Sequence, residues 1–274
     1  MTRSNAKADA ERQIAYLDKA AASDAGRAYK QHVLHELRIL PGHVVLDVGC
    51  GPGADLPAMA AATGPTGKVI GVDHDPVMRD TARHRTRAYP SVEIQAGDAH
   101  ALPVEPASVD RARADRVLHH LADPATAVGE LRRVLRPGGR VALAEPDWDT
   151  LAIDARDLAT SRAYTRFVTT KVVRNAAIGR SLGSLLHNAG FVVESVDATV
   201  AVFRDYRSAE AILRMPTVAE RAWQAGHLDE DVARAWLTGL ATGPFLAAVT
   251  FFTATGRLPE DRPAQPGTGK DSDC

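Results

Sequence analysis

Leu-Asp-Val-Gly-Cys-Gly-Pro-Gly, at residues 46–53, begins as an apolar strand and ends as a glycine turn. Val44 and Val45 precede it, Asp47 follows the apolar run, and glycines then occupy every second position. Glycine reaches backbone conformations that other residues avoid, so the pattern is typical of a strand that enters a tight turn and opens a helix. Many nucleotide-type ligands bind at such turns, and the glycines alone do not choose among them.

Strands and helices alternate on both sides of this turn. Short apolar runs predict strands at 44–48, 68–72, 92–96, 109–114 and 140–144, and helices are expected at 54–62, 76–88 and 125–135. Asp75 is the expected N-cap of the second helix, with Pro76 at its first position. This order requires a parallel sheet with helices on both faces, so the predicted fold class is α/β, Rossmann-like and doubly wound. Two further strands are expected at 191–203 and 245–253.

Three segments outside this alternation are predicted to be mainly helical. They lie at 8–39, 151–189 and 208–240. We therefore expect an N-terminal helical lid at residues 1–40 and a main domain at 41–256, with helical insertions near 151–189 and 208–240. Residues 257–274 are rich in proline, glycine and aspartate and are predicted to be a disordered tail.

Composition narrows the class of protein. The 274 residues are 45% hydrophobic and 24% charged, with a net charge of −1, so the basic surface expected of a nucleic-acid binder is absent. No apolar run of about 18 residues occurs, so no membrane association is expected. The two cysteines, Cys50 and Cys274, are not expected to pair, which favours a reduced, cytoplasmic protein. A monomer or a homodimer is expected.

The glycine turn matches two ligand-binding patterns. Gly49, Gly51 and Ala54 fit the dinucleotide pattern G-x-G-x-x-G/A, whereas Asp47, Gly49, Gly51 and Gly53 fit the denser D-x-G-x-G-x-G. The denser pattern resembles motif I of the class I S-adenosylmethionine-dependent methyltransferases, within the group of small-molecule and quinone-biosynthesis enzymes. Similar segments follow in the family's order at 69–73, 97–103, 109–121 and 131–139. The resemblance implies S-adenosylmethionine as cofactor and a seven-stranded, mostly parallel sheet with the last strand antiparallel and helical lid segments.

The expected cofactor contacts follow from these motifs. Asp47 can accept from the ammonium of the methionine tail, and a pyrophosphate would not suit an anion there. The resemblance assigns Asp73 to the ribose hydroxyls and Asp98 to the adenine amine. The remaining predicted contacts are Gly49, Cys50, Gly51, Gly53, His74, Ala99 and Arg116. As alternatives, the glycines could serve only the turn, Asp73 could be a helix cap, Asp98 could be a turn residue, and Cys50 could serve packing.

Candidate catalytic residues follow the fourth and fifth strands. His119 or His120 could remove a proton from the acceptor, and Glu145 or Asp147 could orient the ring. Alternatively, the Leu-His-His-Leu segment could be architectural, because it is common in the family whatever the substrate. No third and fourth ligands are spaced for zinc, so no metal is expected.

The acceptor contacts are the least defined part of the predicted site. Tyr16, Asp147 and Trp148 are candidate substrate-binding residues. An arginine beside a sulfonium is unfavourable, so Arg116 is expected to pair with Asp115 or an acidic substrate, or to point away. Arg111 and Arg113 are also unusual in a buried strand and have no explanation from the sequence.

The predicted activity is S-adenosylmethionine-dependent methyl transfer to a small organic molecule, in bacterial specialised metabolism. One alternative is C-methylation of a quinone ring. Another is an S-adenosylmethionine-binding protein that has been repurposed for chemistry other than methylation. A nicotinamide-dependent dehydrogenase is a third alternative, because Asp73 would suit the ribose of either cofactor. The expected partner is a small-molecule acceptor, with neither nucleic acid nor membrane.

Overall fold

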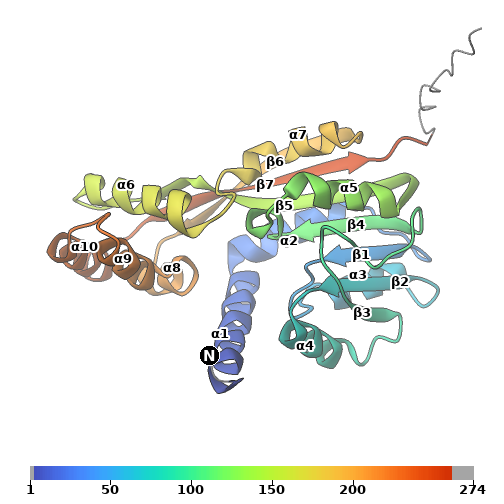
Figure 1. Cartoon of the computed structure of the whole chain (residues 1–274), viewed down its shortest axis with the longest axis horizontal. Coiled ribbons are helices and arrows are strands. Elements are labelled where there is room, and N and C mark those ends of the chain that lie inside the picture. Colours follow the sequence, from blue (N-terminus) through green and yellow to red (C-terminus); the bar gives the residue numbers. More distant parts are fainter. Residues whose placement is uncertain (1–2, 261–274) are drawn as a thin grey trace, which may run out of the picture.

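A single seven-stranded sheet forms the centre of the structure, a computed structural model that describes residues 3–260. The strands lie in the order β3-β2-β1-β4-β5-β7-β6, and β7 is antiparallel to both of its neighbours. They are β1 (Val44–Val48), β2 (Lys68–Asp73), β3 (Val92–Ala96), β4 (Val109–Asp115), β5 (Leu135–Ile153), β6 (Val192–Phe203) and β7 (Ala247–Arg257). This arrangement confirms the predicted doubly wound sheet with its last strand antiparallel (Figure 1).

The helices occupy the segments between the strands and before the first one. They are α1 (Arg3–Ala22), α2 (Asp24–Glu36), α3 (Leu56–Thr63), α4 (Pro76–Thr86), α5 (Pro124–Val134), α6 (Leu158–Phe167), α7 (Ile178–Asn188), α8 (Tyr206–Leu213), α9 (Met215–Gln224) and α10 (Glu230–Thr242). Asp75 caps α4 as predicted, since its carboxylate accepts from the Val77 and Met78 amides at 2.7 and 3.3 Å. Among the described residues, no helix has both the length and the apolar character needed to cross a membrane.

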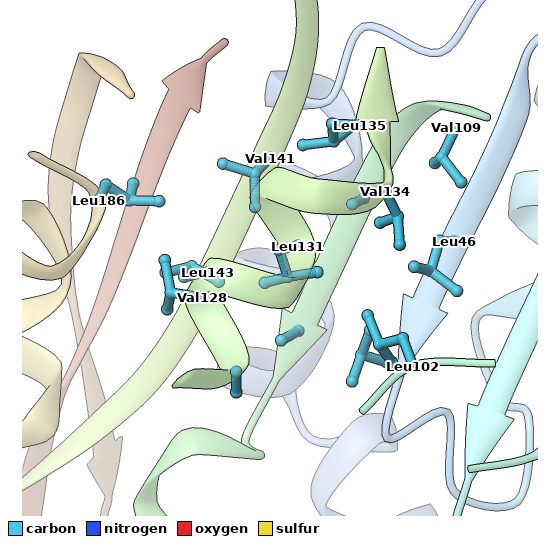
Figure 2. Close-up of a cluster of buried hydrophobic side chains, with 14 of the residues drawn as sticks. Leu46, Leu102, Val109, Val128, Leu131, Val134, Leu135, Val141, Leu143 and Leu186 are labelled. Atoms are coloured by element: carbon cyan, nitrogen blue, oxygen red, sulfur yellow. The ribbon is translucent and has the colours of Figure 1, made fainter. Parts of the chain in front are cut away.

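Two separate cores cover the two faces of the sheet. On one face, α5 and α7 pack their leucines and valines against β1, β4 and β5, as Figure 2 shows for Leu46, Leu131 and Leu186. On the other face, α3 and α4 cover β1 and β2, while Tyr29 and Val33 of α2 pack near β5. Alternate residues along these central strands therefore point into different cores, as in any sheet that is buried on both sides.

A third core lies where β5, β6 and β7 continue beyond the rest of the sheet. Helices α6, α8, α9 and α10 gather there, at the left of Figure 1, around Tyr164, Met215 and Trp236. The pairing of β5 with β7 shifts between Asp147 and Ala152, which marks where β5 leaves the main sheet. Within the expected insertion at 151–189, α6 belongs to this extension, whereas α7 packs on the main sheet. The division into lid, domain and insertions stays a prediction, and most of the expected tail, residues 261–274, lies outside the described residues.

The glycine turn after β1 is held by β2 and by the loop after β4. The amides of Gly49 and Cys50 donate to the Val72 carbonyl at 2.8 and 3.1 Å. Gly49 has a φ of +65°, and a Cβ added there would lie 2.4 Å from the Val117 side chain. Glycine is therefore required here both by its left-handed backbone and by close packing.

Gly49→Ala is expected to destabilise the protein more than the same change at an open left-handed glycine. Gly226 has a φ of +74° and nothing within 4 Å of an added Cβ, so Gly226→Ala carries only the backbone penalty, roughly 1–2 kcal/mol. Overpacking against Val117 should add about 1–3 kcal/mol to the loss at Gly49. Urea denaturation measures both variants, and equal losses would show that Val117 moves away freely.

Candidate active site

The carboxyl ends of β1, β2 and β3 bring the three predicted cofactor aspartates to one edge of the sheet. The Asp73 carboxylate accepts from the Gly51 amide at 2.8 Å and from the Asp75 amide at 2.9 Å, so it holds the glycine turn against β2. Asp98 lies in the loop after β3 with its side chain 67% exposed. Its Oδ1 accepts from the His100 amide and ring at 2.9 and 2.7 Å, and these bonds lower the pKa of its carboxyl group. Asp98 is thus an exposed anion suited to accept from an amine.

The other predicted cofactor residues surround this edge. Cys50 is buried beside Gly71, and burial raises the pKa of its thiol, which fits packing and not reactivity. His74 is 88% exposed next to Asp73, and Ala99 packs partly buried against the main core. Gly53 has a φ of +78°, so it continues the left-handed turn. These residues and the aspartates form a backbone cradle with acids at its rim, which fits an adenosine that carries a cationic methionine tail.

Asp47 and Arg113 form a buried ion pair across neighbouring strands. The parallel register of β1 and β4 sets these two residues side by side. Arg113 Nε and Nη2 lie 3.0 and 3.2 Å from the two Asp47 carboxylate oxygens, and the residues are only 3% and 2% exposed. Burial raises the pKa of Asp47 even though Arg113 opposes the shift. Contact of Asp47 with the cofactor ammonium stays a prediction, because the structure gives its carboxylate an internal partner.

This pair is one end of a larger charge network. Arg113 Nη2 also donates to Asp55 at 2.7 Å, at the start of α3. Lys30 of α2 lies 2.5 Å from Asp55 and 2.7 Å from Asp115, at the end of β4. Burial alone would raise the pKa of Asp55, but Arg113 and Lys30 together lower it. The network therefore joins β1, β4, α3 and α2 through alternating acidic and basic side chains, and it explains an arginine inside the fourth strand.

Arg116 follows the network on the loop after β4. Its backbone is left-handed, with a φ of +57°, and its side chain is 15% exposed. Nε lies 3.9 Å from Asp115 Oδ1, beyond hydrogen-bond distance, and has no hydrogen-bond partner. The expected pairing with Asp115 is therefore loose, which leaves the guanidinium able to bind a second anion.

The sequence left four possible histidine–carboxylate pairs. The structure forms the pair of His119 and Glu145. His119 Nδ1 lies 2.5 Å from Glu145 Oε2, and both residues are buried. Glu145 Oε1 accepts from the Val117 and Leu118 amides at 2.7 and 2.5 Å. A carboxylate with these partners favours a proton on Nδ1, which leaves Nε2 of a neutral ring as the acceptor.

His120 packs against His119, with ring centroids 3.8 Å apart and ring planes tilted by 44°. Burial, followed by the charges of His119 and Arg116, lowers the pKa of His120 to about 4, so it is neutral near pH 7. Asn175 also holds this loop, since its side-chain amide donates to the Leu118 and Leu121 carbonyls at 2.9 and 2.8 Å. The two rings therefore sit on a loop fixed by Glu145 and Asn175.

A cavity of about 310 Å³ opens beside this loop. Its walls come from α1, the loop after β4, the extended part of β5–β7, and helices α6, α8 and α9. His119, His120, Arg116, Tyr16 and Trp148 all line it. Asp147 is fully buried and pairs with Arg180 of α7, so its predicted contact with a substrate has no support from its surroundings. Among the described residues, no cluster of metal-binding side chains is present.

Helix α1 links the cavity to the glycine turn. Leu17 lines the cavity, and its Cδ1 lies 3.8 Å from where a Cβ of Gly51 would be. Asp18, the next residue, makes two 2.8 Å hydrogen bonds with Arg85 of α4. α1 thus runs between α4 and the helices of the extension (Figure 1), and the cavity adjoins the cofactor turn.

Several functional residues were not found from the sequence. Lys30, Asp55 and Asn175 carry no local motif, and their partners lie far away along the chain. Asp55 precedes Leu56-Pro57, so the sequence could have identified it as the residue at the start of a helix, but not its contact with Arg113. Nothing near Lys30 or Asn175 in the sequence indicates a site.

Arg113→Met is expected to destabilise the protein by about 3–5 kcal/mol, because it leaves Asp47 buried without its partner. Arg111→Met is the matched control, since Arg111 lies two residues earlier on the same strand and bonds only to backbone carbonyls. Its loss should stay below about 1 kcal/mol. Adding Asp47→Asn to Arg113→Met should recover part of the stability in urea denaturation. A double variant that is less stable than Arg113→Met alone would contradict the pairing.

Comparison with known proteins agrees with this geometry. A model of the methyltransferase domain matches residues 46–143. An uncharacterized 37.1 kDa protein in transposon TN4556 of Streptomyces fradiae is 50% identical over 245 residues, which are 89% of this chain and 71% of that protein. Demethylmenaquinone methyltransferase of Staphylococcus aureus is 33% identical over 127 residues, 46% of this chain and 53% of that enzyme, so the match spans about half of its length.

Solved structures agree on the fold. The crystal structure of YcgJ from Bacillus subtilis superposes with a TM-score of 0.60 at 24% identity, covering 84% of this chain and all of that one. The motifs, the sheet order and these relatives point to one conclusion. The chain belongs to the class I S-adenosylmethionine-dependent methyltransferases, and S-adenosylmethionine is its cofactor.

Proposed function

We propose that the protein is an enzyme that transfers the methyl group of S-adenosylmethionine to a small organic molecule in bacterial specialised metabolism. The observation that carries the proposal is the cavity of about 310 Å³, which adjoins the glycine turn and is lined by the His119–Glu145 pair. Its size falls at the low end of the range of small-molecule sites. A nucleic-acid substrate is disfavoured by the net charge of −1.

The cofactor side of the proposal rests on the three strand-end acids. The bound cofactor would supply an electrophilic methyl group on its sulfonium. Asp73 would accept from the ribose hydroxyls and Asp98 from the adenine amine, while Gly49 and Gly51 let the backbone approach the cofactor without a Cβ. α1 would exclude water from the same turn through Leu17.

The acceptor side rests on the oriented histidine. Glu145 holds Nδ1–H of His119, so Nε2 could take the proton of a hydroxyl acceptor, whose oxygen would then displace the neutral thioether from the cofactor's methyl group. Glu145 then stabilises the charged ring. Tyr16 and Trp148 line the cavity and are proposed to contact the acceptor. His120 is neutral near pH 7 and adds no positive charge near the sulfonium.

C-methylation of a quinone ring is a second candidate. It is supported by the 33% identity to demethylmenaquinone methyltransferase over residues that include the cofactor turn. The same His119 would deprotonate a ring hydroxyl and so increase the electron density on the ring carbon that attacks the methyl group. Mass spectrometry of the product separates the two, because an O-methyl group is removed by ether cleavage and a C-methyl group is not. A repurposed cofactor-binding protein would bind the cofactor and give no methylated product.

Cofactor binding provides the first test. Wild-type protein should bind S-adenosylhomocysteine in calorimetry and should not bind NAD. Asp73→Asn should weaken the binding of S-adenosylhomocysteine by roughly 10- to 100-fold, because a charged acceptor of hydrogen bonds is lost. Asp80→Asn is the control, since Asp80 is 77% exposed on the adjoining helix α4 and pairs only with Arg83. NAD binding, or unchanged affinity in Asp73→Asn, would contradict the proposed site.

The proton position on His119 provides a second test. In nitrogen-15 NMR, wild-type His119 should carry its proton on Nδ1, because Glu145 accepts there. In Glu145→Gln, the side-chain carbonyl can still bind the Val117 and Leu118 amides, so its NH₂ would face Nδ1 and move the proton to Nε2. Transfer to a hydroxyl acceptor should then fall by about 10²- to 10⁴-fold. His120→Asn is the control, and a wild-type ring with its proton on Nε2 alone would rule out this base.

A further inference from the structure

The charged side chains that line the cavity all carry the same sign. Arg116, Arg214 and Arg221 reach it, whereas no aspartate or glutamate is among the described residues of its walls. Buried acids nearby, such as Asp115 and Glu145, are already engaged by Lys30 and His119. A cavity that also faces a sulfonium would therefore hold several positive charges, and of its arginines only Arg116 has an acid nearby, Asp115 at 3.9 Å. This excess of positive charge favours an anionic occupant.

Two of these arginines belong to a single stripe of α9. Arg214 is the N-cap of this helix, and Thr217, Val218 and Arg221 follow at helical spacing. All four residues line the cavity, as expected for positions i, i+3, i+4 and i+7 of one helix face. Arg214 and Arg221 are exposed and have no acidic partner among the described side chains. They form an unpaired basic rim on the side of the cavity built by α8 and α9.

Two of the three cavity arginines have a left-handed backbone. Arg214 has φ and ψ of +52° and +39°, and Arg116 has a φ of +57°. Left-handed backbone is disfavoured for a long side chain, and within residues 3–260 only two further residues other than glycine adopt it, Arg38 and Ala107. Strain of this kind persists where the surroundings impose it, which occurs preferentially at ligand sites.

Two buried donors in the cavity wall also lack acceptors. Arg116 Nε and Trp148 Nε1 are buried and have no hydrogen-bond partner, and both residues line the cavity. Buried N–H groups are nearly always paired in folded proteins, so these two indicate that an occupant supplies oxygen atoms. Much of the remaining wall is apolar and includes Phe203, Leu213 and Phe251, although polar side chains such as Tyr16 and Thr217 also line it.

We infer that the methyl acceptor is an amphiphilic oxyanion, an apolar molecule with a carboxylate or phosphate group. This inference rests on the proposed function. The anionic group binds Arg214 and Arg221 at the rim, the apolar body lies along Phe203 and Leu213, and the reacting atom reaches His119. Arg116 and Trp148 donate to oxygen atoms closer to the histidine. An anionic acceptor would explain why Arg116 is tolerated beside a cationic cofactor.

Binding of matched amphiphiles tests the inference. The full chain, saturated with S-adenosylhomocysteine, is titrated with decanoate, decyl phosphate and 1-decanol, which share one alkyl chain. We expect at least one anion to bind tenfold or more tightly than decanol, and the better anion identifies the head group. In Arg214→Gln/Arg221→Gln this preference should disappear, while decanol binding stays within about twofold.

Arg204→Gln/Arg207→Gln is the matched control. It removes the same charge from two exposed positions, Arg204 just before α8 and Arg207 in its first turn, and neither lines the cavity, so the anion preference should persist. Equal binding of the three amphiphiles, no binding of either anion, or a preference that survives in Arg214→Gln/Arg221→Gln would each overturn the inference. Absence of S-adenosylhomocysteine binding in the first step would instead refute the proposed function, so the two failures are distinguishable.

Discussion

The buried pair of Asp47 and Arg113 is the interaction on which the site depends. Each charge would cost several kcal/mol if it were buried without the other, so the pair is stable only in the register that sets β4 beside β1. Asp55 and Lys30 extend the pair to α3 and α2. One network of charges therefore fixes the glycine turn, the end of β4 and the base of the N-terminal helices relative to one another.

The position of α1 follows from this network. Because Lys30 anchors α2, the preceding helix is directed across the glycine turn, where Asp18 binds Arg85 and Leu17 covers Gly51. The same helix closes one side of the cavity, whose other side is built by residues from the second half of the chain. The cofactor turn and the cavity are thus adjoining compartments separated by α1 and the loop that carries His119.

Charge is distributed unequally between these compartments. On the side of the glycine turn, Asp73 and Asp98 present acids, which would suit a ligand that carries a positive sulfonium and ammonium. On the cavity side, Arg116, Arg214 and Arg221 present only positive charge. The carboxylate of Glu145 is fully engaged, because it is hydrogen-bonded to His119 and to two backbone amides. A methyl group would pass from an acidic compartment to a basic one, so charge alone would help to keep the two ligands in their own sites.

The sequence by itself determined the doubly wound sheet, the Asp75 cap and the glycine turn, because each depends on periodicity or on neighbouring residues. It narrowed the histidine–carboxylate pair to four combinations, and it left Arg113 and Arg116 unexplained. Tertiary structure chose His119 with Glu145, extended β5 to Ile153 beyond its expected end, and gave Arg113 its partners. It also placed Arg214 and Arg221 on the cavity. These contacts join residues far apart along the chain, and only strand register and helix packing bring such residues together.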